Sequence, residues 1–433
     1  MIVMNHQSGN NLHGINCKRV EEEKKKYFWG VEGSLLHFNP FTLLLFFIVQ
    51  SFYLSRSAVR GQRSSFSCFL IMSGIYIHIP FCRRKCGYCD FYSVENTPAD
   101  AFVPALTAEM RQTALSWNQL FDTLYIGGGT PSLLKKAPLT RLITEIRARF
   151  RFSVDAEWTI EVNPESASAE KFTHYLNLGI NRLSIGVQSF LPQELTLLNR
   201  VHTAGQIAET VQMAKTAGFR NIGLDLIYGL PYQTADQWEQ TLNRAAGLEP
   251  DHISAYALTW NRNTKLGRSI LEGVCPAPDD DHVADLFLKA HSFLKSNGFH
   301  HYEISNYAKP GFECRHNRLY WSGDAYLGLG PSAHSFDGQT RWWNISDVET
   351  YHHRLGRNES PVKGRETLSE TELALEKTAL GLRTDSGILI GEQISDEQAE
   401  RLCGEGLATC KKNRLILTPK GFLLADEIAV RIT

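Results

Sequence analysis

The sequence predicts an α/β protein built on a partial β/α (TIM-like) barrel and followed by a small C-terminal domain that is winged-helix-like. Three observations lead to this prediction. From residue 72 onward, short β-branched runs alternate with longer amphipathic stretches, which is typical of buried parallel strands joined by helices. Polar and glycine-rich segments fall where the predicted strands end. The character of the sequence changes after about residue 365.

The composition is that of an ordinary globular protein, with 433 residues, 43% hydrophobic, 21% charged and a formal net charge of −1. This length allows roughly two to three domains at ~150 residues each. The balanced charge gives no reason to expect nucleic acid or an anionic membrane surface as a partner. Nine cysteines scattered through a long chain do not resemble a secreted disulfide framework, so we expect a cytoplasmic protein.

Residues 1–71 are predicted to be an extension that is disordered or absent from the native protein. They contain the charged run EEEKKK (21–26) and the apolar run FTLLLFFIVQSFYL (41–54). The apolar run is shorter than the ~20 residues that a membrane-spanning helix needs, and no signal-peptide cleavage site is evident. We favour Met72 as the start, because MSGIYIHIPFC leads directly into a strand.

The barrel core is predicted for residues 72–310. Its strands are IYIHI (75–79), TLYIGG (123–128), WTIEVN (158–163), RLSIGVQ (182–188), NIGLDLIYG (221–229) and HISAYAL (252–258). The helices between them include residues 98–117, 138–150, 168–179 and 203–218. Six such units favour a barrel over an open sheet, and the binding groups of a barrel lie at the C-terminal ends of its strands. The segments GGGTP, EVNPE, GVQSF and DLIYGLP all fall there.

The rest of the chain divides into a linker region, residues 311–365, and a C-terminal domain, residues 366–433. In the C-terminal domain, residues 368–384 are predicted to form a helix that Ser369 and Glu372 cap. A short strand, a turn and a closing helix follow. Winged-helix folds often bind DNA, but this domain carries eight Lys and Arg against twelve Asp and Glu, a net charge of 8 − 12 = −4. That charge repels phosphate, so we expect a packing domain that binds no nucleic acid.

Three cysteines lie within eight positions of the segment CRRKCGYC: Cys82, Cys86 and Cys89. Thiolates favour zinc, copper(I) or iron–sulfur clusters. A structural zinc site needs four ligands, usually in two separate pairs, and no second pair follows here. A [4Fe–4S] cluster held by three thiolates keeps one iron open to an outside ligand. The missing fourth cysteine therefore predicts an incomplete cluster that binds a substrate or cofactor.

This segment resembles the cysteine signature of radical S-adenosylmethionine (SAM) enzymes. The resemblance implies a radical SAM barrel in which the amino and carboxylate groups of SAM bind the open iron. One electron then cleaves SAM to methionine and a 5′-deoxyadenosyl radical. The glycines of GGGTP let the backbone approach SAM closely. The residues that the resemblance implies for SAM are Tyr76, Tyr88, Gly128, Gly129, Thr130, Glu161, Gln188, Arg200 and Asp225. The structural alternatives are that the two tyrosines are ordinary core aromatics, that the glycine run forms a tight turn, and that the polar residues beyond the strands form a solvated rim.

The segments IYIHIPFC, GGGTPS, IEVNPE, GVQSF and DLIYGLPYQT resemble the oxygen-independent coproporphyrinogen III oxidase-like (HemN-like) group over essentially all of residues 72–433. In that group, true oxidases carry a further cysteine two positions after the third cluster cysteine. Phe91 occupies that position here. The departure puts oxidative decarboxylation of coproporphyrinogen III in doubt.

The segment CRHNRLYW (314–321) carries the His-Asn-x-x-Tyr-Trp motif of HemW-type heme chaperones. Imidazole and thiolate are both axial ligands of heme iron, and aromatic faces suit a porphyrin. The resemblance therefore implies heme contacts, and the candidates are His316, Asn317, Tyr320, Trp321 and Cys314. Packing of a loop under the barrel is the structural alternative.

The sequence therefore predicts a heme chaperone that binds a [4Fe–4S] cluster, SAM and heme and delivers heme to acceptor hemoproteins. An apo-hemoprotein and a reductant for the cluster are the implied partners, and a homodimer is left open. No catalytic residue is assigned. The enzyme alternative is coproporphyrinogen III dehydrogenase in porphyrin biosynthesis. A zinc-stabilised interaction module without cofactor chemistry is the third alternative.

Overall fold

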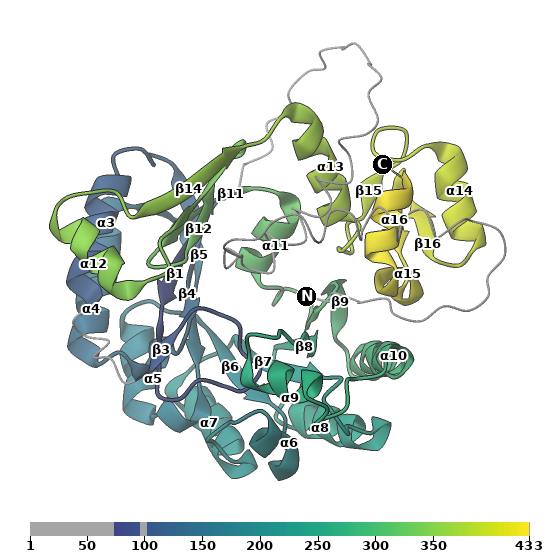
Figure 1. The fold of residues 1–433 in the computed structure, drawn as a ribbon, viewed down its shortest axis with the longest axis horizontal. Helices are drawn as coiled ribbons and strands as arrows, with labels where there is room; N and C mark the ends of the chain where they lie inside the picture. The colour runs from purple at the N-terminus through teal and green to yellow at the C-terminus, as the bar shows by residue number, and fades with distance from the viewer. Residues whose placement is uncertain (1–72, 96–101, 433) are drawn as a thin grey trace. The chain divides into compact units, whose positions relative to one another are not determined.

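The computed structural model describes residues 73–95 and 102–432 (Figure 1). All of these residues belong to one compact unit of the chain. The predicted extension, residues 1–71, and its apolar run, residues 41–54, lie outside the described ranges. Within those ranges, no helix is both long enough and apolar enough to span a bilayer.

The predicted barrel is present. Six neighbouring parallel strands of a twelve-stranded sheet form it. They are β1 (Ser73–Ile79), β4 (Leu120–Gly128), β5 (Arg151–Val162), β6 (Arg182–Gln188), β7 (Ile222–Tyr228) and β8 (His252–Ala257). Each overlaps one of the six predicted strands, and β6 has the predicted bounds. The central strands β6 and β7 are almost wholly buried, because helices cover the outer face of the barrel and neighbouring strands flank them on both sides.

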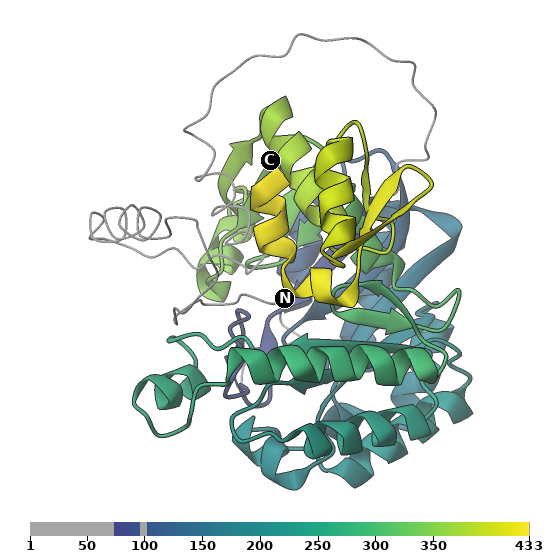
Figure 2. The ribbon, with the colours of Figure 1, turned by 90° about the vertical axis from the view of Figure 1, so that its right-hand side faces the viewer.

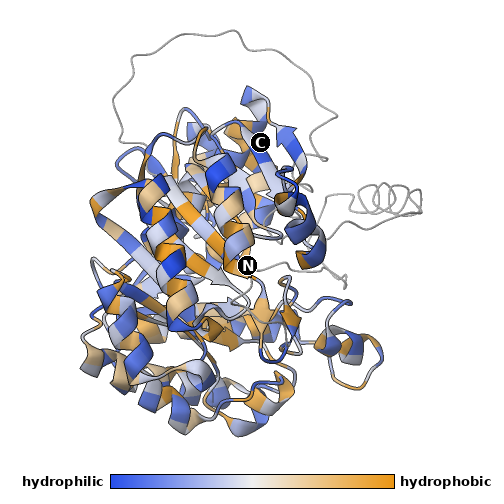
Figure 3. Ribbon diagram, turned by 90° about the vertical axis from the view of Figure 1, so that its left-hand side faces the viewer, coloured by the Kyte–Doolittle hydropathy of each residue, from blue (hydrophilic) through white to orange (hydrophobic). Residues whose placement is uncertain are grey.

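Helices cover the outer face of the barrel, as Figure 1 shows. They are α3 (Val103–Thr113), α4 (Lys136–Arg149), α5 (Ala169–Asn177), α6 (Pro192–Leu197), α7 (Ala204–Ala217), α8 (Ala235–Gly247), α9 (Lys265–Leu271) and α10 (Asp280–Ser296). In α4, the apolar residues recur at helical spacing and are buried, from Leu139 to Ile146. Figure 3 shows this pattern as orange and blue bands along the outer helices.

Residues 311–365 form part of the main sheet, so the prediction of a linker region needs correction. This segment contains α11 (Arg315–Ser322), β11 (Ala325–Leu329), β12 (His334–Phe336), β13 (Thr340–Asn344) and α12 (Val348–Gly356), and leads into β14 (Val362–Thr367). Strand β11 pairs in parallel with β1, and β12, β13 and β14 continue the sheet in antiparallel order. These strands are short, and their alternation is too brief to separate them from loop sequence. At the opposite edge of the sheet, β10 (Asn306–Ala308) and β9 (His300–Glu303) follow β8.

Helix α11 contacts β1, β4 and β11 on the concave side of the sheet (Figure 1). The buried carboxylate of Glu157 accepts hydrogen bonds from the backbone N–H groups of Arg315 and His316, at 3.2 and 3.3 Å. These are two of the N–H groups that a helix start leaves without partners, and the negative charge suits that end of the helix dipole. Glu157 on β5 therefore fixes where α11 begins inside the barrel.

The C-terminal residues form a three-stranded sheet and four helices, seen at the top of Figure 2. The elements are α13 (Glu370–Gly381), β15 (Ile388–Leu389), α14 (Asp396–Gly404), β16 (Ala408–Lys411), β17 (Arg414–Leu417), α15 (Pro419–Leu423) and α16 (Ala425–Ile432). The predicted cap of α13 is confirmed, because Ser369 and Glu372 each bind the other's backbone N–H. The winged-helix description stays a prediction.

An ion pair joins α11 to this C-terminal part. The guanidinium of Arg318 donates two hydrogen bonds to Asp385, at 3.0 and 3.2 Å, and lies over the ring of Tyr302 at 4.9 Å. Paired hydrogen bonds from arginine to carboxylate are among the stronger polar contacts in proteins.

We predict that Arg318→Ala weakens this junction by about 1–3 kcal/mol in the free energy of unfolding. Urea unfolding and limited proteolysis after residue 365 measure the effect. Arg315→Ala is the matched control on the same helix, because the ion-pair partners of Arg315, Asp122 and Asp155, belong to the barrel and not to the C-terminal part. Equal behaviour of the two variants contradicts the prediction.

Candidate functional site

The three clustered cysteines lie beyond the C-terminal end of β1, where a barrel places its binding groups. Cys82 ends the two-residue strand β2 (Phe81–Cys82), which pairs with β3 (Val94–Glu95) on the other side of the cysteine loop. The pairing closes residues 82–94 into a loop. All three thiols are free and partly buried.

Backbone hydrogen bonds dock this loop onto the barrel. The N–H of the buried Gly87 donates to the carbonyl of Leu198 at 3.0 Å, and its carbonyl accepts from Leu266 N–H at 2.7 Å. The amide of Asn199 donates to the carbonyl of Lys85 at 2.9 Å. The middle of the loop is therefore held by residues that follow β6 and by the start of α9.

A hydrogen-bond network joins two of the three sulfurs. Arg200 Nη1 donates to Cys86 Sγ at 3.3 Å, and Arg200 Nη2 donates to Asn163 Oδ1 at 2.8 Å. Asn163 Nδ2 in turn donates to Thr130 Oγ1 at 3.1 Å. Thr130 Oγ1 donates to Cys82 Sγ at 3.6 Å. Donors aimed at sulfur stabilise thiolates and tune a cluster that thiolates hold.

The three sulfurs of the cysteine loop are partly buried, and side chains donate hydrogen bonds to two of them. Within the described ranges, no three His, Cys, Asp or Glu side chains converge closely enough to hold a single ion. Burial raises the pKa of Cys82, and burial together with Cys86 raises the pKa of Cys89 to about 12. A bound cation reverses this effect, because metal-bound thiols lose their proton. Three free thiols fit a [4Fe–4S] cluster, and the N–H and O–H donors on two of their sulfurs support this fit.

The glycine run after β4 passes close to the start of the cysteine loop. Gly129 N–H donates to the carbonyl of Ile79, and Thr130 N–H donates to the carbonyl of Phe81, both at 2.8 Å. A Cβ on Gly129 would stand 2.8 Å from the Phe81 oxygen, so no other residue fits there. Gly128 has a φ of +112°, and a Cβ there would meet the ring of His78.

Glu161 and two tyrosines face one another inside the barrel. Tyr125 OH donates to Glu161 Oε1 at 3.0 Å, and Gly128 N–H donates to Glu161 Oε2 at 3.1 Å. Burial, together with the charge of Asp225, raises the pKa of Glu161 to about 7. The ring of Tyr76 stacks on Tyr125 at 6.2 Å, and its hydroxyl bonds to His78 Nδ1 at 3.1 Å.

The other predicted SAM residues lie on different elements of the structure. Gln188 ends β6 with a φ of +66°, which is strained for a residue with a side chain and marks a constrained site. Asp225 lies within β7, where Ser184 Oγ donates to its carboxylate. Tyr88 packs beside the buried cluster formed by Leu198, Ile227 and Leu230.

The His-Asn-x-x-Tyr-Trp motif lies in the N-terminal half of the barrel, away from the cysteine loop. His316 is 1% exposed. Its Nδ1 bonds to Thr123 Oγ1 at 2.7 Å, and its Nε2 bonds to Tyr320 OH at 2.9 Å. Burial lowers the pKa of His316 to about 3. Both ring nitrogens thus have partners inside the protein.

Cys314 is fully buried, and its thiol donates to Glu157 Oε1 at 3.5 Å. The remaining motif residues, Asn317, Tyr320 and Trp321, are partly exposed. The ring of His316 stacks on Tyr125 at 5.2 Å. The motif therefore contacts Tyr125, and Tyr125 also donates a hydrogen bond to Glu161.

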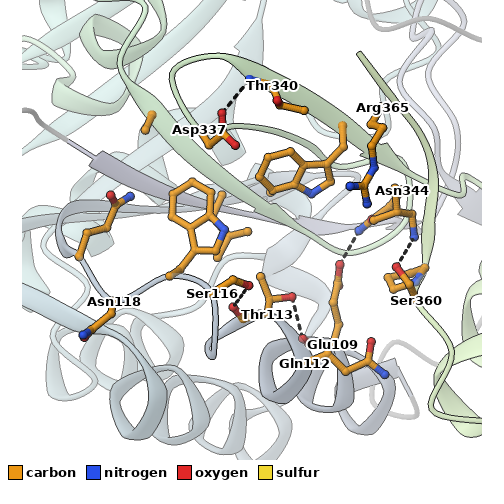
Figure 4. Close-up of a pocket in the computed structure, with 18 residues that line it drawn as sticks. Glu109, Gln112, Thr113, Ser116, Asn118, Asp337, Thr340, Asn344, Ser360 and Arg365 are labelled. Carbon is orange, nitrogen blue, oxygen red and sulfur yellow. Dashed lines mark hydrogen bonds between the residues drawn. The ribbon is translucent and has the colours of Figure 1, made fainter. Parts of the chain in front are cut away.

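A separate cavity of about 780 Å³ lies between α3 and the strands β11, β13 and β14 (Figure 4). Glu109 lines it and accepts hydrogen bonds from Asn344, Gly330 N–H and Tyr351. Burial raises the pKa of Glu109 to about 7. No cluster cysteine and no residue of the His-Asn-x-x-Tyr-Trp motif lines this cavity, so it is distinct from the site described above.

The sequence interpretation missed several residues that organise the site. Asn163 lies in the segment EVNPE and has no predicted role, although its amide connects Arg200 to Thr130. Its position at the end of β5 was the available signal. Tyr125 and Glu157 gave no signal, because a tyrosine or a glutamate within a strand is equally typical of core packing or of an exposed face.

Comparisons with known proteins agree with this fold and site. Residues 76–245 match the Radical SAM superfamily. The structure resembles that of coproporphyrinogen III oxidase (HemN) from Escherichia coli, which is described as a radical SAM enzyme. The TM-score is 0.72 and the sequence identity is 27%, and the match covers 83% of this chain and 89% of that chain. The fold and the cysteine loop define a radical SAM protein.

Curated relatives narrow the family. The chain is 39% identical to heme chaperone HemW of Mycobacterium tuberculosis (strain H37Rv) over 365 residues, covering 82% of this chain and 93% of that protein. It is 34% identical to heme chaperone HemW of Bacillus subtilis (strain 168), covering 82% of this chain and 98% of that protein. The chain belongs to the HemW-type radical SAM family.

We predict that Asn163→Ala weakens retention of iron and sulfide roughly 10-fold, because Arg200 and Thr130 lose the amide that orients them. Iron and sulfide content after anaerobic reconstitution and stepwise chelation measures this. Asn243→Ala is the control, because its amide donates to the carbonyl of Glu239 within α8. Unchanged retention in Asn163→Ala would show that the network does not support the cluster.

Proposed function

We propose that this protein is a heme chaperone that binds a [4Fe–4S] cluster, SAM and heme and delivers heme to acceptor hemoproteins. The observation that carries the proposal is the identity to HemW proteins over nearly their whole length. Phe91 supports it, because this residue stands where true oxidases carry a further cysteine and offers no thiol there.

Cys82, Cys86 and Cys89 are the proposed ligands of the cluster, whose open iron would bind SAM. When bound, the cluster supplies an electron for reductive chemistry on SAM. The proposed SAM contacts are Tyr76, Tyr88, Gly128, Gly129, Thr130, Glu161, Gln188, Arg200 and Asp225. Glu161 has the strongest structural support among them. Glu161 is partly exposed, and two donors already fix its carboxylate, so it can accept hydrogen bonds in a set orientation.

Heme is proposed to contact the His-Asn-x-x-Tyr-Trp motif. Asn317, Tyr320 and Trp321 are partly exposed, which supports them as the first residues of the motif to contact a porphyrin. Cys314 and His316 are buried. For His316 to bind iron, its bond to Thr123 or to Tyr320 must break.

Coproporphyrinogen III dehydrogenase is the second candidate, because the structure resembles the E. coli oxidase over 89% of that chain. The two candidates differ in their product. We expect anaerobically reconstituted protein, supplied with SAM and a reductant, to retain heme and pass it to an apo-hemoprotein. Conversion of coproporphyrinogen III to protoporphyrinogen IX would overturn the chaperone proposal.

The acceptor hemoprotein and the reductant for the cluster are proposed partners. A cytoplasmic location and a homodimer remain predictions from the sequence. The acidic C-terminal domain supports no role for nucleic acid.

The Glu161 carboxylate gives a pH test of SAM binding. If ionised Glu161 accepts hydrogen bonds from SAM, affinity increases as the pH rises through about 7. The groups that surround this carboxylate are Tyr76, Tyr125, Asp225 and Arg182. Tyr125 lowers the pKa by donating to the carboxylate, so Tyr125→Phe should shift the transition to higher pH. Equilibrium dialysis of SAM at a series of pH values measures it.

Glu161→Gln is the control, because an amide does not titrate and should abolish the transition. A pH profile that is the same in the wild type and in Glu161→Gln would contradict this role for Glu161.

A second test separates a heme ligand from a packing residue. We expect His316→Ala to lower heme retention at least 10-fold, measured by the Soret band after gel filtration. Thr123→Val keeps the shape of the buried side chain but frees Nδ1 of His316, so it should retain heme at least as well as the wild type. The melting temperature of each variant is measured alongside, because removal of a buried ring also creates a cavity.

If Thr123→Val loses heme together with His316→Ala, and both variants melt early, His316 supports the barrel and does not bind iron.

A further inference from the structure

Two cysteines far from the cluster segment lie side by side in the C-terminal domain. Cys403 is on α14 and Cys410 is on β16, and their Sγ atoms are 2.8 Å apart. Both are free thiols; Cys403 is partly buried and Cys410 is exposed. Neither belongs to the proposed cluster, SAM or heme site.

Regular backbone structure holds the two thiols together. The chain turns after α14 at Gly406, whose φ is +72°, and Leu407 N–H donates to the carbonyl of Leu402 at 3.0 Å. Strand β16 then pairs with β17 through a hairpin whose central residues, Lys412 and Asn413, both have positive φ. A hairpin of this kind is tightly constrained. The pair is therefore positioned by the fold and not by a loop.

The two thiols differ in the roles they can take. The exposed Cys410 is open to reagents in solution, and the cationic residues Lys411 and Lys412 follow it directly. Burial, together with Cys410, raises the pKa of Cys403 to about 11. Thiol–disulfide exchange requires access for the attacking thiol and a second thiol within reach to resolve the mixed disulfide.

We propose that Cys403 and Cys410 form a dithiol site that low-molecular-weight disulfides, such as glutathione disulfide, oxidise reversibly to an intramolecular disulfide. Cys410 is the entry thiol and Cys403 is the resolving thiol.

The reaction balances without any other reactant. The thiolate of Cys410 attacks one sulfur of glutathione disulfide, which forms a Cys410–glutathione mixed disulfide and releases one glutathione thiolate. Cys403 then gives up its proton and attacks Cys410 Sγ, and the second glutathione leaves. Together, two protein thiols and one glutathione disulfide yield one protein disulfide and two reduced glutathione molecules. The new bond ties α14 to β16, and closing this short loop stabilises the C-terminal domain.

The test uses the full chain with its cluster loaded, under anaerobic conditions, and a visible spectrum confirms that the cluster persists. After incubation with glutathione disulfide, free thiols are alkylated and the peptides are mapped by mass spectrometry. We expect a Cys403–Cys410 cross-link two hydrogens lighter than the dithiol, reversed by dithiothreitol. The melting temperature of the C-terminal part should rise by about 5 °C.

Two variants separate the roles of the thiols. In Cys403→Ser, a glutathione adduct should persist on Cys410, because no resolving thiol is present. In Cys410→Ser, Cys403 should remain largely unmodified. Cys275, in the loop after α9, is the internal control and should react more slowly than Cys410. Alkylation of both Cys403 and Cys410 after oxidation of the wild type would overturn the proposal, as would modification of Cys275 at the same rate as Cys410.

Discussion

The site depends on the hydrogen bonds of the Arg200 guanidinium, which join the cysteine loop to the rim of the barrel. The guanidinium donates to the sulfur of Cys86, to the amide of Asn163 and to the carbonyl of Gly186. Asn163 extends the network through Thr130 to Cys82. Residues that follow β4, β5 and α6 thus orient two sulfurs of the proposed cluster site. Precise positions of this kind require support from rigid elements.

The interior of the barrel is polar along its whole length, and this constrains what α11 can do. Glu157 fixes the start of α11, and His316 fills the space beside Thr123 and Tyr125. Tyr125 also donates to Glu161, which lies near the C-terminal end of β5 and accepts from Gly128 N–H. Buried polar groups need partners, so the proposed SAM residue and the proposed heme motif share one hydrogen-bonded interior. A change at either end alters the partners available to the other.

Phe91 is the residue on which the proposed function distinguishes this chain from the oxidases that it resembles in fold. It is 56% exposed and lies within the cysteine loop. In true oxidases the corresponding residue is a cysteine, whereas here the side chain is large and apolar and offers no thiol chemistry. The fold resembles that of the E. coli oxidase, so the difference in proposed function rests on side chains at the site and not on architecture.

The sequence by itself determined the barrel and the cap of α13, because each depends on a local signal: strand–helix alternation for the barrel and a Ser-x-x-Glu pair for the cap. It did not determine that residues 311–365 complete the main sheet, because strands as short as β12 carry too little periodicity and pair only with distant partners. Nor did it identify Asn163, Tyr125 or Glu157 as organising residues. Their importance comes from which side chains face them across neighbouring strands, and only the tertiary structure sets that register.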